Sequence, residues 1–348
     1  MTIREIAQRA GVSPATVSLV LNGKNGVSVQ TRKKVQALLD KYGYEHKRTA
    51  SHSGKKNIRF IKYQEHGLLV EHNGDFISCV IDGIEDAARS AGINLTITNT
   101  NANNLERMIE QINAEKDDGI IFLGTEFQQS DAHILKKLNA PVVVVDNEMR
   151  NQDFDSVVMD NEHAVYLAVS HLKSLGHTRI GHIRSKYVTD NFYARELGFQ
   201  RAMQELNLPV RSTDTYSVQP DLQSSVQTLF QYAQENKDFP TAFFADNDIL
   251  AIGAMRAFRK AGIRIPNDLS IVGMDDLMLA SISEPLLTTL KIHKKTMGKM
   301  AVSRLLDKIF QGDRTVLKIL VDVELVVRKS TGPCMKKESD SCKWNEVK

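Results

Sequence analysis

Residues 12–23 read Val-Ser-Pro-Ala-Thr-Val-Ser-Leu-Val-Leu-Asn-Gly and decide the fold of the first part of the chain. Ser13 predicts a helix N-cap, because its hydroxyl can accept a hydrogen bond from the first turn, and Pro14 suits the first helical position. Asn22-Gly23 predicts the end of this helix. Its inward-facing positions are expected to be Val17, Val20 and Leu21.

A further helix on each side completes a three-helix unit. Upstream, Thr2 and Glu5 have the spacing of a capping box, and the helix is expected to end at Gly11. Downstream, Ser28 predicts the N-cap of the third helix. The inner faces are Ile3, Ile6, Ala7 and Ala10 in the first helix and Val35, Leu38 and Leu39 in the third. Two helices joined by a three-residue turn are typical of a helix-turn-helix unit, whose second helix enters the major groove of DNA.

The charge distribution supports this interpretation independently. Residues 1–57 hold eleven lysines and arginines against three acidic residues, a net charge of +8, while the other 291 residues carry −5. A basic head on an acidic body is typical of a protein that binds a polyanion. The alternative is a small helical bundle with solvated lysines. It is disfavoured because caps, turn length and charge agree with one another.

Composition excludes several classes of protein. The chain has no signal peptide and no apolar run long enough to cross a bilayer, so we expect a cytoplasmic protein. Its three cysteines, Cys79, Cys334 and Cys342, form no disulfide framework and no metal-ligand spacing. We expect no metal and no cofactor.

From about residue 57 short apolar runs alternate with amphipathic helical stretches. This alternation predicts an α/β body of doubly wound parallel sheets with strands buried on both faces. Ligands of such sheets bind outside the carboxyl ends of the strands. The predicted strands are Ile58–Tyr63, Ile93–Thr98, Gly119–Leu123, Val142–Asp146, Ser156–Met159, Ile180–Ile183, Ala242–Ala245, Ser270–Met274 and Thr289–Ile292.

Polar residues stand where several of these strands end. Asp146, Asn247 and Asp275 each close or follow a strand, and Arg195 lies on a predicted helix that begins near Asn191. Carboxylates, carboxamides and a guanidinium that converge in a cleft can hold adjacent hydroxyl groups of a sugar. Asp or Asn after a strand is also a common helix N-cap, and the sequence leaves that reading open at each site.

Motifs along the whole chain resemble the LacI/GalR (lactose repressor) family of bacterial transcriptional regulators. The resemblance spans about residues 2–331. It rests on residues 12–23 and on Gly176-His177-Thr-Arg179-Ile-Gly181, residues 245–254, residues 265–276, Pro285-Leu-Leu-Thr-Thr289 and Val323-Glu-Leu-Val-Val-Arg328-Lys-Ser330. It implies a periplasmic-binding-protein-like body of two lobes, with three crossings near residues 157–161, 284–290 and 316–320.

The resemblance sets the expected domain boundaries. Residues 1–44 are the helix-turn-helix domain, residues 45–57 an atypical polar linker, and residues 58–331 the effector-binding and dimerisation body. Within the body, the first lobe comprises 58–158 and 289–317 and the second comprises 160–286 and 318–331. The charged tail, residues 332–348, is expected to be disordered.

Family positions for the effector transfer to particular residues of this chain. The expected contacts are Asp75, Phe76, Asp146, Asn191, Arg195, Pro220, Asn247 and Asp275. Pro220 stands where relatives often stack an aromatic ring on the ligand, although Phe76, Phe192 or Tyr193 could take that role. The effector itself stays unidentified at this point.

The resemblance also implies the DNA contacts, with two departures. Relatives often carry a long polar residue at the position of Leu19, so contacts to phosphates and thymine methyls should dominate here. The linker lacks the proline and the leucine wedge of the family, so its basic residues are expected to follow phosphates, with steep salt dependence and little bending of the operator. The expected contacts are Thr2, Ser13, Pro14, Ala15, Thr16, Ser18, Leu19, Asn22, Ser28, Thr31, Lys47, Arg48, Lys55 and Lys56.

The predicted function is a transcriptional regulator, most simply a repressor of carbohydrate-utilisation genes, that binds a palindromic operator as a homodimer. Effector binding between the lobes would change the spacing of the two heads. The dimer face is expected on the helix at residues 76–92, and the tail lacks the leucine heptads of a tetramer-forming coiled coil.

The sequence is also compatible with a different kind of effector, but fits two other classes of protein less well. Control by a nucleobase or a partner protein remains an alternative for the same DNA-binding role. A sugar-binding transport component would have no use for the basic head. A sugar-acting enzyme is not indicated either, because phosphate loops, nucleophile elbows and metal motifs are missing from the sequence. The chain is therefore expected not to be an enzyme.

Overall fold

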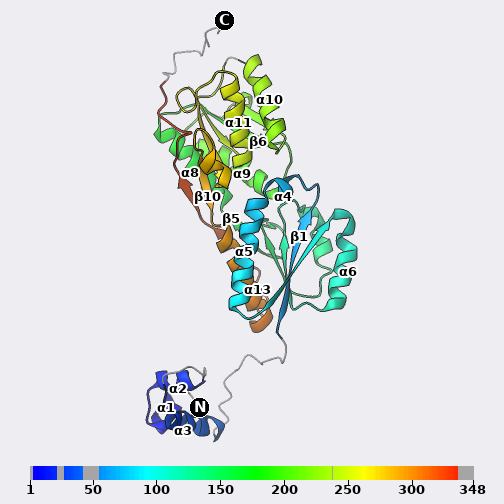
Figure 1. The fold of residues 1–348 in the computed structure, drawn as a ribbon, viewed down its shortest axis with the longest axis vertical. Coiled ribbons are helices and arrows are strands. Elements are labelled where there is room, and N and C mark those ends of the chain that lie inside the picture. Colours follow the sequence, from blue (N-terminus) through cyan, green and yellow to red (C-terminus); the bar gives the residue numbers. More distant parts are fainter. Residues whose placement is uncertain (1–2, 22–26, 42–54, 237, 336–348) are drawn as a thin grey trace. The chain divides into compact units, whose positions relative to one another are not determined.

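The computed structural model describes residues 3–21, 27–41, 55–236 and 238–335. The chain forms two compact units, Met1–Lys55 and Lys56–Lys348, here called the head and the body. No helix among these residues is both long enough and apolar enough to pass through a membrane. Each unit is described by itself below (Figure 1).

The head is a three-helix unit, as predicted. Its helices are α1 (Ile3–Ala10), α2 (Pro14–Leu21) and α3 (Val29–Lys41). The Ser13 hydroxyl accepts the Thr16 amide hydrogen bond at 3.1 Å, and the Ser28 hydroxyl accepts that of Thr31 at 3.2 Å. Both predicted N-caps are therefore confirmed, whereas the capping role of Thr2 lies outside the described residues.

The core of the head follows the predicted helical stripes, except at Ile3 and Leu21, whose side chains lie outside the description. Its buried side chains are Ile6, Ala7, Ala10, Val17, Val20, Val35 and Leu39. Val12, Val27 and Leu38 pack against them and are partly buried. Through this core α2 packs against both α1 and α3.

The body consists of two lobes, each built on a six-stranded sheet. The first sheet is entirely parallel, in the order β11-β5-β4-β3-β1-β2. Its strands are β1 (Asn57–Gln64), β2 (Asn94–Asn101), β3 (Gly119–Leu123), β4 (Val142–Val145), β5 (Asp155–Met159) and β11 (Lys318–Val321).

The second sheet has the order β12-β10-β9-β8-β6-β7 and is parallel except for β12, which runs antiparallel to β10. Its strands are β6 (Ile180–Ser185), β7 (Thr215–Val218), β8 (Ala242–Ala245), β9 (Ser270–Asp275), β10 (Thr288–Ile292) and β12 (Val323–Val326). The predicted fold class, a helix-turn-helix head and a doubly wound two-lobed body, is thus confirmed.

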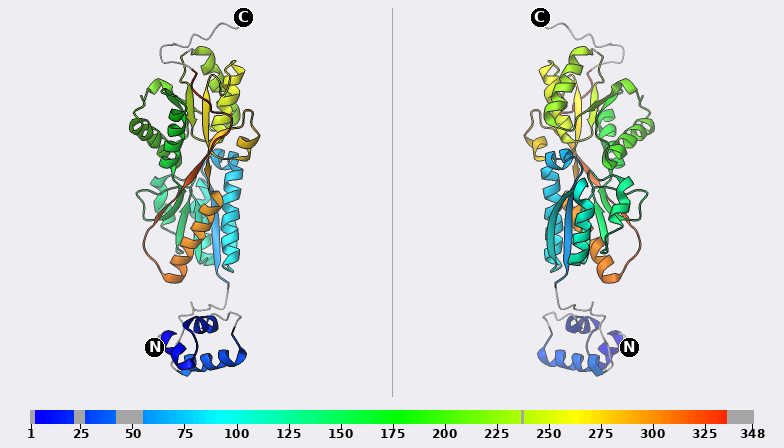
Figure 2. Two further views of the ribbon diagram at one scale, coloured as in Figure 1. Left: turned by 90° about the vertical axis from the view of Figure 1, so that its left-hand side faces the viewer. Right: turned by 90° about the vertical axis from the view of Figure 1, so that its right-hand side faces the viewer.

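Helices cover both sheets (Figures 1 and 2). Those of the first lobe are α4 (Leu68–His72), α5 (Gly74–Ser90), α6 (Leu105–Glu115), α7 (Ala132–Leu135) and α13 (Lys294–Gln311). Those of the second lobe are α8 (Asn161–Ser174), α9 (Asp190–Glu205), α10 (Leu222–Glu235), α11 (Asp248–Lys260) and α12 (Met278–Ile282).

Glycines allow α5 and α13 to pack closely. A Cβ atom on Gly83 would lie 2.1 Å from the Lys295 carbonyl oxygen, and one on Gly298 would lie 2.2 Å from the Val80 carbonyl oxygen. No side chain fits at either distance, so glycine is required at both positions. This close packing fixes α5, whose first turn faces the second lobe.

All nine predicted strands are present, with ends that shift by a few residues. The prediction that they are buried on both faces is wrong for β2, an edge strand whose residues, apart from Thr100, are exposed or half-buried. Strands β7, β11 and β12 were not predicted. They are four residues long, and β11 and β12 are separated by Asp322 alone, so their apolar pattern is too short to stand out.

The chain crosses between the lobes at Asp160, His293 and Asp322. The first crossing lies where it was predicted, and the other two lie further along than residues 284–290 and 316–320. Strand β10 pairs with β9 and so belongs to the second lobe, while β11 pairs with β5 and belongs to the first. Figure 2 shows the segment that carries β11 and β12 passing from one lobe to the other.

Part of the predicted disordered tail is anchored to the second lobe. The Cys334 amide donates to the Leu175 carbonyl at 2.8 Å, and the Gly332 carbonyl lies 3.1 Å from the His177 ring nitrogen. Because these backbone groups find partners in the body, the order extends past residue 331. Residues 336–348 lie outside the described part of the chain.

Candidate functional site

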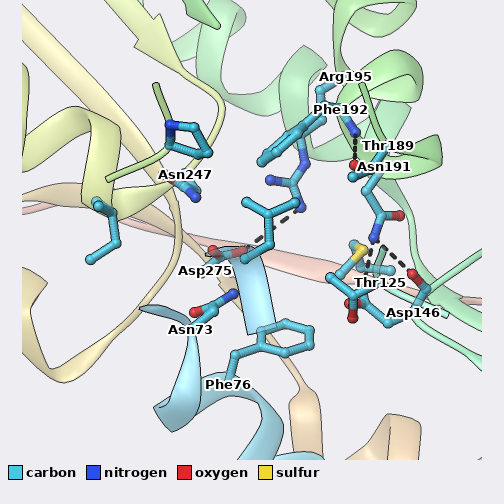
Figure 3. A pocket seen from close by; sticks show the side chains of 14 residues that line it. Asn73, Phe76, Thr125, Asp146, Thr189, Asn191, Phe192, Arg195, Asn247 and Asp275 are labelled. Atoms are coloured by element: carbon cyan, nitrogen blue, oxygen red, sulfur yellow. Dashed lines mark hydrogen bonds and ion pairs between the residues drawn. The ribbon is translucent and has the colours of Figure 1, made fainter. Parts of the chain in front are cut away.

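A pocket lies between the two lobes, where the carboxyl ends of the parallel strands meet (Figure 3). Its free volume is about 30 Å³, small against the roughly 300–1,000 Å³ of typical ligand pockets. A larger ligand therefore requires the lobes or the side chains to move apart. The lining residues are Leu69, Asn73, Phe76, Thr125, Asp146, Met159, Thr189, Asn191, Phe192, Arg195, Pro220, Asn247, Ile249 and Asp275.

Seven of the eight residues predicted to contact an effector line this pocket, and Asp75 does not. Asp75 is exposed in the first turn of α5, whereas its neighbour Phe76 is buried. Consecutive helical residues point in directions about 100° apart, so both cannot face one pocket. The polar residue that this segment supplies is instead Asn73, just before α5.

Asp146 follows β4 and is held in a left-handed backbone conformation with φ of 65°. Thr125 Oγ1 donates to Asp146 Oδ2 at 2.5 Å, and Asn191 Nδ2 donates to Oδ1 at 2.8 Å. Burial raises the pKa of Asp146 to about 6, against the opposing effects of the Thr125 hydrogen bond and Arg195. Asn191 comes from the second lobe, so this contact also joins the lobes.

The raised pKa of Asp146 predicts how Asp146→Asn changes stability with pH. In the native protein, ionisation costs more in the folded than in the unfolded state, so stability falls as pH rises from about 4 to 6. The variant lacks this cost. The difference in unfolding free energy, variant minus native, should therefore rise over this range by up to about 3 kcal/mol and then level off. Urea titrations at each pH measure it, and a flat difference would contradict the assignment.

Arg195, on α9, is buried and makes three directed contacts. Its Nε donates to Asn161 Oδ1 at 2.9 Å, and Nη1 donates to the backbone carbonyl of Asp246. Its Nη2 lies 3.8 Å from Asp275 Oδ1, which is an ion pair without a close hydrogen bond. The guanidinium is therefore fixed on two sides and retains hydrogen-bonding capacity toward the pocket.

Asp275, at the end of β9, is buried and has a φ of 114°, a strained value for a residue with a side chain. Burial raises the pKa of its carboxyl, and Arg195, Lys294 and a hydrogen bond from Asn73 oppose that shift. Asn73 belongs to the first lobe and Asp275 to the second. This pair is a second polar contact across the cleft, with Asp275 held as an acceptor.

Asn161 was not predicted, yet it connects the polar residues of the pocket. It follows the crossing at Asp160, and its Nδ2 donates to Asn191 Oδ1 at 3.0 Å while its Oδ1 accepts from Arg195. A continuous hydrogen-bonded chain therefore runs from Asp146 through Asn191 and Asn161 to Arg195. Any ligand that displaces Arg195 or Asn191 acts on this chain.

The helix-capping interpretation is correct for Asn247, whose Oδ1 accepts the Leu250 amide at 2.9 Å at the start of α11. The residue nevertheless lines the pocket. Apolar surface comes from Phe76, Phe192 and Pro220, and the Arg195 guanidinium lies 5.5 Å from the Phe192 ring centre. Aromatic rings next to polar groups suit a ligand with both C–H or π surface and hydrogen-bonding edges.

The described lining of the pocket combines hydrogen-bonding and apolar groups. Its described lining contains carboxylates, carboxamides, a guanidinium and threonines, but neither histidine nor cysteine. No group of three or more His, Cys, Asp or Glu among the described residues could hold a metal ion. Acceptors and donors on both lobes can hold a small polar molecule and couple it to lobe position.

The predicted DNA contacts lie at the starts of α2 and α3 where the structure describes them. Ser13 and Pro14 are exposed, and the Ser13 and Thr16 hydroxyl oxygens lie 2.9 Å apart. Ser28 and Thr31 form the same pair at 2.8 Å. Ala15, Ser18 and Leu19 belong to α2, but their side chains lie outside the description, as do Thr2, Asn22, Lys47 and Arg48 altogether.

Lys56, predicted to contact a phosphate, is paired with a carboxylate of the body, and its contact with DNA stays a prediction. Lys56 Nζ lies 2.5 Å from Asp118 Oδ1 in a half-buried ion pair of the body. A charge neutralised in this way contributes little to attraction of phosphates. Lys55, one residue earlier, is exposed and remains available.

Comparison with known proteins matches both parts of the chain. Residues 2–46 match the family described as bacterial regulatory proteins, lacI family, and residues 169–331 match a periplasmic binding protein-like domain. Two relatives have the name HTH-type transcriptional repressor PurR. That of Photobacterium profundum is 30% identical over 333 residues, 94% of this chain and 98% of its own. That of Serratia proteamaculans is 32% identical over 337 residues, which cover 94% of this chain and 96% of its own.

Solved structures of similar proteins share the fold of the whole chain. The Lac repressor dimer bound to operator and the anti-inducer ONPF has a TM-score of 0.71 at 27% identity, covering 95% of this chain and 99% of its own. A LacI family transcriptional regulator from Enterococcus faecium with bound ribose has a TM-score of 0.66 at 27% identity, covering 80% and 100%.

Proposed function

Because this chain belongs to the lacI family of bacterial regulatory proteins, and is a DNA-binding transcriptional repressor, we propose that a small polar ligand bound between the lobes controls its operator binding. The observation that supports this most directly is the convergence of Asp146, Asn191, Arg195 and Asp275 in one buried pocket. These residues come from both lobes, so a ligand that contacts them changes lobe position. A change in lobe position alters the fit of two heads to a palindromic site.

The first candidate for the ligand is a sugar. Carboxylates and a guanidinium bind pairs of hydroxyl groups, and the rings of Phe76 and Phe192 can cover the C–H face of a pyranose or furanose. The ribose in the Enterococcus faecium regulator supports this class. The second candidate is a purine base, which the relatives named PurR favour.

A thermal-shift screen of the full-length protein tests the proposal. Monosaccharides, disaccharides and nucleobases are added singly, and a ligand at 100 times its dissociation constant should stabilise the protein by about 2.7 kcal/mol. A hit must also change binding to an operator fragment selected from random duplex DNA. If no compound of either class shifts the melting temperature, control by a small ligand of these classes is wrong.

We propose that the protein acts in the cytoplasm as a homodimer, without enzymatic activity. Its DNA contacts would include Ser13, Thr16, Ser28 and Thr31 at the starts of α2 and α3. The Lac repressor dimer on its operator supports this arrangement. Helix α5 is the expected dimer face, and a sedimentation experiment that finds a monomer or a stable tetramer would contradict it.

The basic linker predicts a steep salt dependence of operator binding. If Lys47 and Arg48 each neutralise a phosphate, replacing both with alanine should reduce the slope of log K against log salt concentration by about 2 per linker. Fluorescence anisotropy at a series of KCl concentrations measures the slope. Lys186→Ala, on the exposed surface of the body, is the control and should not change it. An unchanged slope in the double variant would show that the linker makes no phosphate contact.

A further inference from the structure

The pocket has an unusual charge balance for a ligand site. Two buried carboxylates, Asp146 and Asp275, face a single guanidinium, Arg195, whose Nη1 donates to the carbonyl of the buried Asp246. Lys294 acts on Asp275 from α13 but does not line the pocket. A negatively charged ligand would therefore enter a site in which nearby carboxylates repel it at low dielectric.

Arg195 is poorly placed to compensate for this repulsion. Two of its three nitrogens already donate to Asn161 and to the Asp246 carbonyl, and the third is closest to Asp275. A phosphate needs a fork of two parallel donors for strong recognition by arginine. The geometry leaves one nitrogen, so an anionic group can bond this residue at one nitrogen but not by the bidentate pair.

Two carboxamides in the same pocket have unused hydrogen-bonding atoms. Asn73 Oδ1 is buried and has no hydrogen-bond partner. Among the described residues it is the only buried side-chain nitrogen or oxygen without one. Asn247 uses its Oδ1 to cap α11, and its Nδ2 makes no hydrogen bond to a residue that the structure describes. Figure 3 shows Asn73 and Asn247 on the same side of the pocket, with Asp275 near them.

An unpaired buried acceptor is costly, so it needs an explanation in a folded protein. Asn73 stands on the first lobe and Asn247 on the second, and both line the pocket. A ligand group that donates to Asn73 and another that accepts from Asn247 would satisfy both atoms. Such a ligand would bridge the lobes through neutral partners.

We propose that the pocket selects an uncharged ligand, which donates a hydrogen bond to Asn73 Oδ1 and accepts one from Asn247 Nδ2. The proposal rests on the proposed function and narrows its ligand class. Neutral sugars, nucleosides and nucleobases have both donors and acceptors and fit this pattern. Their phosphorylated forms do not, because the added dianion would lie beside Asp146 and Asp275.

Matched pairs of compounds test the selection for an uncharged ligand. Thermal shifts and calorimetric titrations of the full-length protein compare ribose with ribose 5-phosphate, glucose with glucose 6-phosphate, and inosine with inosine 5′-monophosphate. The neutral member of at least one pair should bind, and its partner should bind at least tenfold more weakly. A phosphorylated member that binds as tightly or more tightly overturns the inference and leaves ligand control intact. Binding by no member overturns both.

Variants test the two carboxamides with the neutral compound that binds. Asn247→Asp keeps the helix cap, because Asp caps as well as Asn, but removes the donor. It should weaken binding at least tenfold, and the ligand-free melting temperature reports separately the cost of the new buried carboxylate beside Asp246 and Asp248. Asn101→Asp is the matched control, since Asn101 also caps a helical turn, at Ala102–Asn104, and does not line this pocket. Unchanged affinity in Asn247→Asp overturns the assignment of that residue.

Asn73→Ala and Asp275→Asn complete the test. Asn73→Ala should also weaken binding at least tenfold, because the ligand loses its acceptor. Asp275→Asn removes one repelling carboxylate. The affinity for the neutral compound divided by the affinity for its phosphorylated form should therefore fall at least threefold. A merely structural role of Asp275 would change both affinities equally. An unchanged ratio therefore overturns the electrostatic basis of the inference.

Discussion

Glu126→Gln should lower the free energy of unfolding by about 3–5 kcal/mol, as expected when the acceptor is removed from a buried charge-assisted network. Glu126 is 4% exposed and lies in the loop after β3. Its two oxygens accept the backbone amides of Glu65, His66, Gly67, Leu69 and Val70 at 2.8–3.1 Å. Glutamine retains one oxygen and directs an N–H₂ group at the remaining amides, so two or three of them lose their acceptor.

The loss should also depend on pH in a defined direction. Burial alone would raise the pKa of Glu126. The hydrogen bonds from the amides of His66, Val70 and their neighbours outweigh burial, so the pKa lies below its ordinary value. The contribution of Glu126 to the free energy of unfolding is therefore complete at pH values above its pKa in the unfolded chain, about 4.3. It is lost as the pH falls through the lower pKa of the folded protein. The difference between native protein and variant should therefore shrink below about pH 4.

Denaturant titration at pH 7 and at about pH 3 measures both effects. The control is Glu106→Gln in the same lobe, where the side chain is 58% exposed and pairs with Lys137, so the expected cost is much smaller than that of Glu126→Gln. Equal costs for the two variants would show that the five amides find water instead. Glu126 holds residues 65–70, which lead to Asn73 and Phe76. Its loss should therefore displace the part of the pocket that these two residues line.

The sequence predicted those parts of the site that have local signals. Ser13 and Ser28 precede apolar helical patterns, and a capping hydroxyl needs partners just three residues away. Asp146 and Asp275 stand at the ends of β4 and β9, and the carboxyl ends of parallel strands meet at one edge of a sheet. Strand prediction placed each carboxylate at the edge of its own sheet, whereas their convergence followed from the resemblance to a two-lobed body, because β4 and β9 belong to different sheets.

Residues whose partners are far away in the sequence could not be predicted in this way. Glu126 binds amides 56–61 positions earlier, and Asn161 binds Arg195 34 positions later. Neither residue repeats at a helical or strand period, so no pattern distinguishes it from a surface polar residue. Asn73 was missed for a related reason, because α4 is a short helix without a periodic signal.

The lobe boundaries show a second limit of sequence reasoning. An apolar strand pattern indicates burial but does not show which sheet the strand joins. Strand β10 pairs through Thr288 with Val272 of the second sheet, and β11 pairs through Lys318 with Ser156 of the first. Pairing depends on tertiary contacts, so the crossings at His293 and Asp322 emerge from the structure and not from composition.

Arg195→Ala should weaken the binding of the effector at least 100-fold and remove its influence on operator binding. Hydrogen bonds to a charged group contribute about 1.5–3 kcal/mol each, and about 2.7 kcal/mol corresponds to 100-fold. The substitution also leaves Asn161 Oδ1 and the Asp246 carbonyl without their donor, and Asp275 without its cation. The coupling chain between the lobes is then interrupted at the residue that contacts the ligand.

Three further variants separate binding from folding. Arg201→Ala, on the same helix α9 with a 63% exposed side chain paired to Glu162, should leave the effector response unchanged. Arg195→Lys keeps the charge but cannot reach Asn161, Asp246 and Asp275 together, so it should restore stability more than affinity. Asp275→Asn in the Arg195→Ala background removes the uncompensated buried charge and should recover stability without recovering the response. If the effector changes the operator affinity of Arg195→Ala to within threefold of its effect on the native protein, the guanidinium does not bind the ligand. It would then only connect the two lobes.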